Sequence, residues 1–131
     1  MSTLKADAIT AVTTNGDVSI SGNGSGGLNM LSGASATPYN AGTKSSGTYT
    51  PDEANANFQY AINGGAHTLA PPTNNCALII QYTNNASAGA ITVSGFTKVD
   101  GDDATTTNGD DFFYYITKLN GFSALTVKAL Q

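Results

Sequence analysis

The sequence lacks the residues on which most nucleic-acid binding depends. Its 131 residues include no arginine, and its five lysines are scattered along the chain at Lys5, Lys44, Lys98, Lys118 and Lys128. The net charge is −4, whereas proteins that bind nucleic acid usually carry a clustered basic face rich in arginine. We therefore expect no nucleic acid among the partners of this chain.

Histidine and cysteine, two common catalytic and metal-binding residues, each occur only once. His67 alternates with apolar neighbours, which is typical of a surface or hydrogen-bonded structural histidine. Cys76 opens the apolar run Cys76–Ile80, which is typical of a buried and unreactive thiol. One residue of each kind allows neither an intrachain disulfide nor a metal site with several His or Cys ligands. The sequence therefore predicts a non-enzymatic protein without catalytic residues, cofactor or metal.

An acidic stretch near the C-terminal end is the main candidate for other chemistry. Five of the nine acidic residues lie in it, namely Asp100, Asp102, Asp103, Asp110 and Asp111. Carboxylates suit calcium, but the stretch lacks the twelve-residue spacing and closing glutamate of an EF-hand. A pair such as Asp102 and Asp110 would serve a glycan-processing enzyme only in a cleft lined by aromatic residues, and the stretch contains none. A solvated acidic loop is favoured, and calcium binding stays open.

Long apolar segments are also absent. Neither a signal peptide nor a transmembrane helix is predicted, so we expect a soluble protein, made in a cytoplasm, without a membrane partner. Charged residues make up only 11% of the chain, against roughly 25% in typical soluble domains. This composition favours neutral, hydrogen-bonding surfaces that pack against neighbouring chains.

Residues 1–50 predict an extended arm used for assembly or anchoring. Its main element is a hairpin at residues 8–20 around Asn15-Gly16, a dipeptide that favours a type I′ turn. The register of this hairpin places Ile9, Ala11, Val18 and Ile20 on one face. Residues 21–50 are rich in Gly, Ser, Thr and Asn and bury too little surface to order themselves. We expect other chains to order the arm, with a loose tail as the alternative.

Residues 51–131 predict a small antiparallel β-sandwich or jelly-roll-like domain. Thr50-Pro51-Asp52-Glu53 is typical of a helix start, so at most one short helix is expected near residues 51–57, with a Pro-led turn as the alternative. Short apolar segments then alternate with turns rich in Asn, Gly and Pro, the pattern of a sandwich or small barrel. Strands are expected near residues 57–62, 66–70, 76–83, 89–94, 96–99, 111–119 and 122–130. The whole chain is thus predicted to be all-β.

The last hairpin has apolar residues on both faces. Asn120-Gly121 predicts a two-residue turn that pairs Leu119 with Phe122. The predicted core face consists of Phe112, Tyr114, Ile116, Leu125, Val127 and Ala129. The opposite face carries Phe113, Tyr115, Leu119 and Phe122, which is unusual for an antiparallel hairpin with one side in water. We therefore expect another subunit or the arm to cover this second face.

Two stretches resemble proteins of tailed-bacteriophage particles. The opening, Thr3–Ile9 followed by Thr13–Gly24, resembles the openings of tailed-phage fibre and virion proteins. The C-terminal part is similar to small domains of phage structural proteins in Asn57–Gln59, Asn63–Ala70, Thr83–Ile91 and Val127–Gln131. The resemblance implies a particle-bound, often trimeric protein, and it brings no catalytic residues with it.

These observations lead to one expectation and two alternatives. We expect a non-enzymatic virion structural protein, most simply a capsid decoration (cement) or head-fibre protein. It would assemble as a homotrimer on the particle, against the major capsid protein or another virion protein. One alternative is a tail-fibre or tail-tip protein that binds a host surface glycan. The other is the small glycan-processing enzyme considered above.

Overall fold

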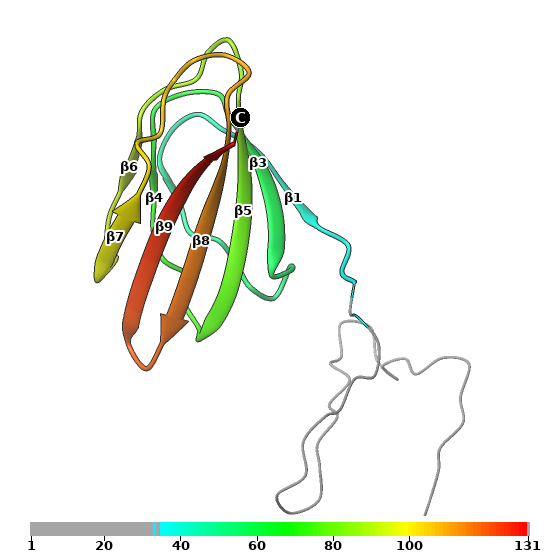
Figure 1. Cartoon of the computed structure of the whole chain (residues 1–131), viewed down its shortest axis with the longest axis vertical. Coiled ribbons are helices and arrows are strands. Elements are labelled where there is room, and N and C mark those ends of the chain that lie inside the picture. Colours follow the sequence, from blue (N-terminus) through cyan, green and yellow to red (C-terminus); the bar gives the residue numbers. More distant parts are fainter. Residues whose placement is uncertain (1–32, 34, 131) are drawn as a thin grey trace, which may run out of the picture. The chain divides into compact units, whose positions relative to one another are not determined.

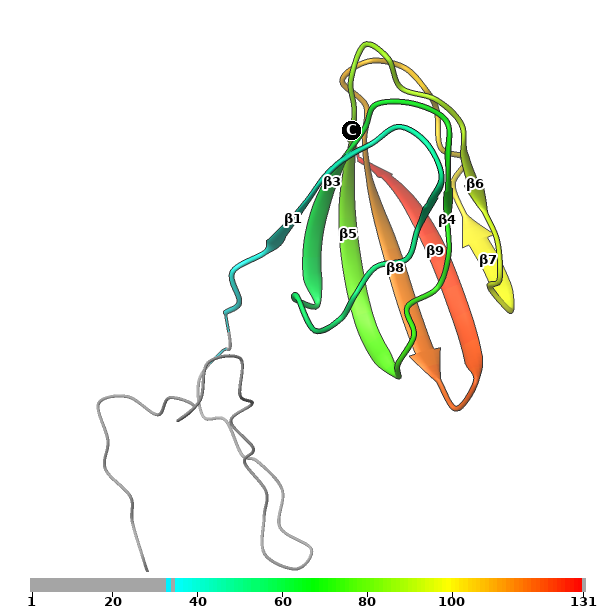
Figure 2. The same cartoon turned by 180° about the vertical axis from the view of Figure 1, so that it is seen from behind.

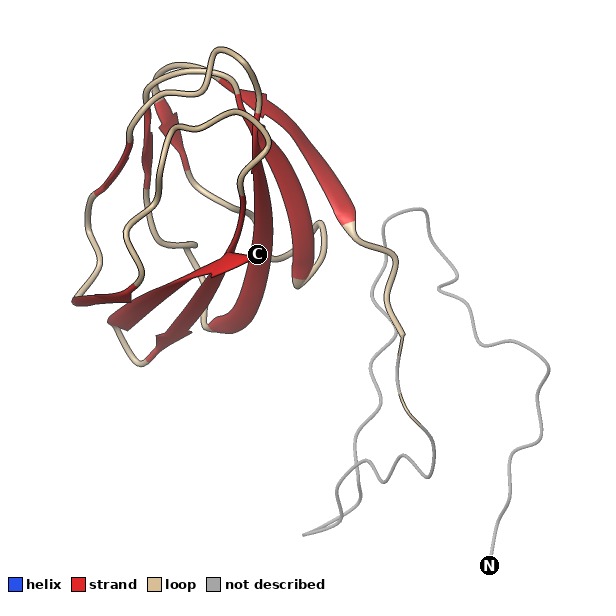
Figure 3. Ribbon diagram, turned by 45° about the horizontal axis from the view of Figure 1, so that its top comes forward, coloured by secondary structure: helices blue, strands red, loops and turns tan. Residues whose placement is uncertain are grey.

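A computed structural model of the chain describes residue 33 and residues 35–130. The chain divides into two units, Met1–Ser35 and Ala36–Gln131, and every strand described here belongs to the second. That part of the chain contains strands, turns and loops but no helix, which confirms the all-β prediction for it (Figure 3). The hairpin predicted at residues 8–20, with Ile9, Ala11, Val18 and Ile20, lies outside the described residues.

The strands form two sheets that share one core. In chain order the strands are β1 (Tyr39–Lys44), β2 (Thr48–Tyr49), β3 (Phe58–Asn63), β4 (His67–Leu69), β5 (Cys76–Asn84), β6 (Ile91–Val93), β7 (Lys98–Gly101), β8 (Asp111–Leu119) and β9 (Phe122–Leu130). The larger sheet has six strands in the order β1-β3-β5-β8-β9-β7, which can be followed from right to left in Figure 1. The smaller sheet has three strands in the order β2-β4-β6.

The first six strands form three stacked coils. The chain passes from the larger sheet to the smaller one and back, so that β1, β3 and β5 pair in parallel, as do β2, β4 and β6. Hydrogen bonds join successive coils at their corners as well, from Gly64 N to Lys44 O (2.9 Å) and from Asn85 N to Asn63 O (3.1 Å). Figure 2 shows the smaller sheet from the opposite side. The predicted antiparallel domain is therefore corrected to a mixed one, and parallel coils depart from the antiparallel Greek keys of a jelly roll.

The last two long strands close the larger sheet as the predicted hairpin. Strand β8 pairs antiparallel with β5 and with β9, and the register of the hairpin pairs Leu119 with Phe122, as predicted. Asn120 and Gly121 have φ values of 50° and 83°, the positive values that a type I′ turn requires. Strand β7 then adds in parallel to the free edge of β9.

Side chains from both sheets fill the core. Its buried apolar members are Ala61, Leu69, Leu78, Ile80, Tyr82, Phe112, Tyr114, Ile116, Leu125 and Val127. Five members of the predicted core face of the last hairpin are buried, and Ala129 packs against them half-buried. Burial in apolar surroundings raises the pKa of Tyr114 to about 12 and raises that of Tyr82 further.

The middle of the chain bears on two expectations. No helix forms at residues 51–57, where the chain makes the Pro-led turn expected as the alternative, closed by a hydrogen bond from Asn55 N to Asp52 O (3.3 Å). The buried Gln59 side chain donates to Asp52 O (2.8 Å) and Ala56 O (2.9 Å), so these carbonyls are engaged by a strand residue. Strands β1 and β2, which fall within the predicted arm of residues 1–50, belong to the two sheets.

Candidate interaction surface

The most distinctive surface is the side of the larger sheet that faces away from the core, called here the outer face. Its larger side chains are Phe58, Tyr60 and Ile62 on β3, Ile79 and Gln81 on β5, and Phe113, Tyr115 and Leu119 on β8, with Phe122 on β9. Six of the apolar ones are at least 40% exposed: Phe58, Tyr60, Ile62, Tyr115, Leu119 and Phe122. Large apolar groups are therefore gathered on a face without a partner in this chain's described part.

Strand β3 has its expected polarity reversed. Its inward side chains are the small or polar Gln59, Ala61 and Asn63, which are at most 3% exposed, whereas its large apolar side chains point outward. A strand with one face in water normally turns its apolar residues inward and its polar residues outward. The arrangement in β3 is explained if its outward side chains are covered in the working state of the protein.

The polar side chains that β3 turns inward are fully engaged. The Asn63 Nδ2 group donates to Asn84 Oδ1 and to Gly89 O, both at 2.9 Å. Gln59 accepts a 2.6 Å hydrogen bond from the Tyr49 hydroxyl on the smaller sheet. No buried side-chain nitrogen or oxygen lacks a partner among the residues that the structure describes. The inward polar side chains of β3 thus form a complete hydrogen-bond network. This network holds Gln59 and Asn63 toward the core and so leaves the other face of the strand exposed.

Two rows of side chains on the outer face lie in register across three strands, with aromatic residues on β3 and β8. One row consists of Phe58, Ile79 and Tyr115, and the next of Tyr60, Gln81 and Phe113. The Phe113 and Tyr115 rings meet edge to face, with centroids 5.9 Å apart and planes at 73°. A shallow groove of about 260 Å³ runs among these two rows. The rows form a continuous apolar patch.

The patch continues to the tip of the β8–β9 hairpin. Leu119 and Phe122 form the last pair before the turn and are 66% and 67% exposed. They border a second hollow of about 450 Å³, which Lys98 and Thr117 also line. The hairpin tip therefore presents the most exposed large apolar side chains of the described chain.

Charge on the outer face lies at its margins. Strands β3 and β5 contain no charged residue. The charged residues on this face lie along β7, β9 and the start of β8, at Lys98, Asp100, Lys128 and Asp111. The two rows at the centre of the outer face are therefore neutral, and the charges surround them.

Four predicted interface residues lie on this surface. Phe113, Tyr115, Leu119 and Phe122 share the outer face, as the register of the hairpin requires. Their role in an interface remains a prediction. Sequence reasoning missed the large side chains of β3 and β5, although the alternation of Phe58, Tyr60 and Ile62 carried the signal.

His67 and Cys76 occupy structural positions. His67 is 5% exposed, with Nδ1 2.8 Å from Gly65 O and Nε2 3.3 Å from the Tyr82 hydroxyl, as expected for a hydrogen-bonded histidine. Cys76 begins β5 and is half-buried, where a buried position was predicted. Burial, followed by the nearby charge of Glu53, raises the pKa of its thiol, which lowers the fraction of reactive thiolate.

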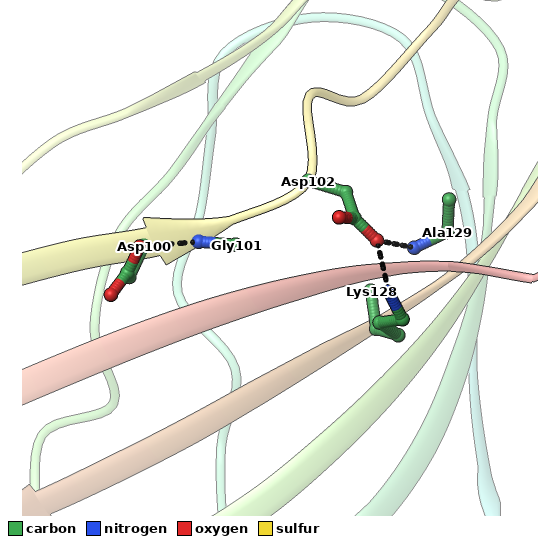
Figure 4. Close-up of polar contacts among 5 residues, drawn as sticks. All are labelled: Asp100, Gly101, Asp102, Lys128 and Ala129. Carbon is green, nitrogen blue, oxygen red and sulfur yellow. Dashed lines mark hydrogen bonds and ion pairs between the residues drawn. The ribbon is translucent and has the colours of Figure 1, made fainter.

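The acidic stretch does not converge on a common point. Asp102 forms an ion pair with Lys128 (2.9 Å) and accepts a hydrogen bond from Ala129 N (3.0 Å), and Asp100 accepts one from Gly101 N (Figure 4). The bond with Lys128, then that from Ala129, lowers the pKa of the Asp102 carboxyl. Across residues 35–130, no three His, Cys, Asp or Glu side chains gather in a group able to hold a metal ion.

Two further findings bear on identity. Among the described residues no helix is present that could cross a membrane. Comparison of the chain with protein-family models, with curated proteins and with solved structures finds no match.

Proposed function

We propose that this chain is a non-enzymatic structural component of a bacteriophage particle, a capsid decoration or head-fibre protein that works as a homo-oligomer. The observation that carries the structural role is the reversed polarity of β3, with Phe58, Tyr60 and Ile62 exposed above a polar interior. The assignment to a phage particle is supported by the resemblance of Thr3–Ile9 and Thr13–Gly24 to phage virion proteins.

The chemistry of the outer face suits packing against protein. The two rows at its centre are aromatic, aliphatic and uncharged, with one amide side chain, Gln81, between Tyr60 and Phe113. Aromatic residues are enriched and charged residues depleted at the centres of protein interfaces. Lys98, Asp100, Asp111 and Lys128 would fall at a polar rim.

The test is location on the particle. The full chain is added to purified particles that lack it, and binding is measured by sedimentation and by imaging of the particle surface. We expect saturable binding at regular positions, lost with Ile79→Lys and retained with Thr92→Lys, a matched change on an exposed position of the smaller sheet. Absence of binding by the wild-type chain to heads and to tails would overturn the proposal.

The groove on the outer face favours one second candidate, a tail-fibre or tail-tip protein that binds a host glycan. Sugars stack on aromatic faces and hydrogen-bond to amides, and the groove combines Tyr60, Phe113 and Tyr115 with the amide of Gln81. An array of host surface glycans should then show binding that Tyr60→Ala weakens and Tyr39→Ala does not. A blank array for the wild-type chain would remove this candidate.

A further inference from the structure

We infer that the outer face of the larger sheet is covered by the same face of a second copy of this chain, with the Phe58–Ile79–Tyr115 row near the centre of the contact. The inference rests on the proposed structural function and names the partner of its surface. Three independent features of the outer face support a second copy as the occupant, namely its charge, its area and its spacing.

The first feature is the absence of charge from its centre. When identical faces meet about a two-fold axis, the residues nearest the axis come close to their own counterparts, so a charge at the centre would face a like charge. Strands β3 and β5 carry none, and Asp102 pairs with Lys128 at the margin (2.9 Å). An unlike partner could instead place an opposite charge against a charge at the centre.

The second feature is the exposed apolar area of the outer face. Aromatic and large aliphatic side chains present roughly 150–250 Å² each, so the six outer-face residues that are 40–67% exposed leave roughly 550 Å² of apolar surface in water. An average interface buries about 800 Å² on each partner, and about 65% of that is apolar between identical subunits, which gives roughly 520 Å². The exposed patch therefore supplies the apolar share of a stable homomeric contact.

The third feature is the spacing between the side chains of the outer face. Side chains on one face of a sheet lie about 4.8 Å apart between strands and about 6.8 Å apart along a strand. A second copy has the same two spacings, so its side chains fit between those of the first when the sheets pack about 10 Å apart. Gln81 lies between Tyr60 and Phe113, so its amide falls between two rings. The groove of about 260 Å³ that Tyr60, Gln81 and Phe113 help to line leaves room there for a side chain of the second copy.

The first experiment measures self-association of the full chain by sedimentation equilibrium over about 1–200 µM. We expect the wild-type chain to associate. The Ile79→Lys change should raise the dissociation constant about 30-fold or more, the loss of affinity typical of a central interface residue. Tyr60→Lys, at an exposed position, provides a second variant if Ile79→Lys fails to fold. Thr92→Lys on the smaller sheet should leave association unchanged.

The second experiment tests that like faces meet. In a Cys76→Ser background, Gln81→Cys should give a covalent dimer with a bismaleimide reagent that spans about 10 Å, whereas Thr92→Cys should not. A cross-link at Gln81 distinguishes a second outer face from a neighbour's N-terminal segment lying on it. Association without this cross-link would overturn the face-to-face contact.

The outcomes separate the inference from the proposed function. A wild-type chain that stays monomeric at 200 µM and still binds particles would overturn the second copy and leave the particle role in place. An oligomer that fails to bind particles would uphold the contact between copies and overturn the particle role. Association unaffected by both Ile79→Lys and Tyr60→Lys would place the interface elsewhere.

Discussion

At the scale of single residues, stability depends on side chains that are polar and yet buried. Asn63 and Asn84 lie side by side on β3 and β5, both at most 2% exposed. Asn63 joins the two strands through Asn84, and Asn84 donates from Nδ2 to Thr105 O (2.9 Å) in the acidic stretch. This pair therefore links two coils and a loop through hydrogen bonds that its side chains donate.

Replacing Asn63 with leucine keeps the branching of the side chain at Cγ and removes the amide. Asn84 Oδ1 and Gly89 O lose their donors, and each buried unsatisfied group costs about 1–3 kcal/mol. We expect Asn63→Leu to lower the free energy of unfolding by about 2–4 kcal/mol, or the melting temperature by roughly 10–20 °C. Asn55→Ala, an exposed turn position, is the control, and equal losses in the two variants would contradict this account.

The raised pKa of Tyr49 predicts that the protein loses stability at alkaline pH. Burial, then the charges of Tyr39 and Asp52, raises its pKa from 10.0 to about 12, so the folded state holds this proton more tightly than the unfolded state. The stability contributed by the neutral hydroxyl is complete below pH 10 and is lost as the pH rises through about 12.

Urea unfolding of the wild-type chain at pH 8 and at intervals above pH 10 would measure this loss. Tyr49→Phe removes the titrating group together with its bond to Gln59 Oε1, so the variant should be less stable at pH 8 but decline less steeply above pH 10. Equal slopes for the two proteins would show that Tyr49 does not contribute to the alkaline decline.

At the scale of elements, a turn predicts the pairing of the strands next to it, whereas pairing between strands far apart in the sequence has no such local signal. The register of the β8–β9 hairpin follows from Asn120-Gly121, because a two-residue turn fixes which residues pair. The β3–β5 pairing has no such turn: Asn63 meets Asn84 across an excursion through β4. Its signal lay in the resemblance of Asn63-Gly64-Gly65 to Asn84-Asn85, a repeat too short to stand out among Asn- and Gly-rich turns.

Of the outer face, the part on β8 could be predicted from the sequence and the part on β3 could not. In β8, the alternation of Phe113 and Tyr115 with core residues showed that both faces are apolar. In β3, hydrophobicity alone assigns Phe58, Tyr60 and Ile62 to the core, whereas the structure buries Gln59 and Asn63. The difference arises from hydrogen-bond partners supplied by other elements, including the Tyr49 hydroxyl, which no local pattern reveals.

The β7–β9 pairing depends on one close approach. A Cβ added at Gly101 would lie 2.1 Å from Val127 O, and Gly101 has a φ of 105°. Gly109 has a φ of 90° but nothing within 4 Å of the position of a Cβ. The two glycines therefore separate the cost of the backbone conformation from that of the steric clash.

Alanine at each position measures the two costs. Gly109→Ala should lose about 1–2 kcal/mol for the left-handed conformation. Gly101→Ala should lose about 2–5 kcal/mol, because the clash with β9 adds to it. Both values come from urea unfolding, and hydrogen exchange should show faster opening at the β7–β9 pair in Gly101→Ala alone. Similar losses for both variants would mean that β7 shifts to relieve the clash.

At the scale of the whole molecule, the neutral centre of the outer face determines how self-association should respond to salt and to temperature. Salt screens charges over about 10 Å at 0.1 M, but it has little to act on between two β3–β5–β8 surfaces. Burial of apolar surface gives a negative change in heat capacity on binding.

Sedimentation at 0.05 M and 1 M NaCl would show which contacts dominate. We expect the dissociation constant of the homo-oligomer to change less than about 3-fold over this range, and calorimetric dilution to show a negative heat-capacity change for association. A large weakening in salt would point instead to contacts made by Lys98, Lys128 and their acidic neighbours.

The position of β9 has a consequence for how the chain is made. Phe122–Leu130, the last strand in sequence, lies between β8 and β7 in the larger sheet and carries Leu125 and Val127 into the core. During synthesis the three coils can form as they leave the ribosome, but β7 has no strand to pair with until β9 has also emerged. A nascent chain stopped before residue 122 would lack Leu125 and Val127 in the core, so we expect it to hold its first three coils while β7 stays unpaired.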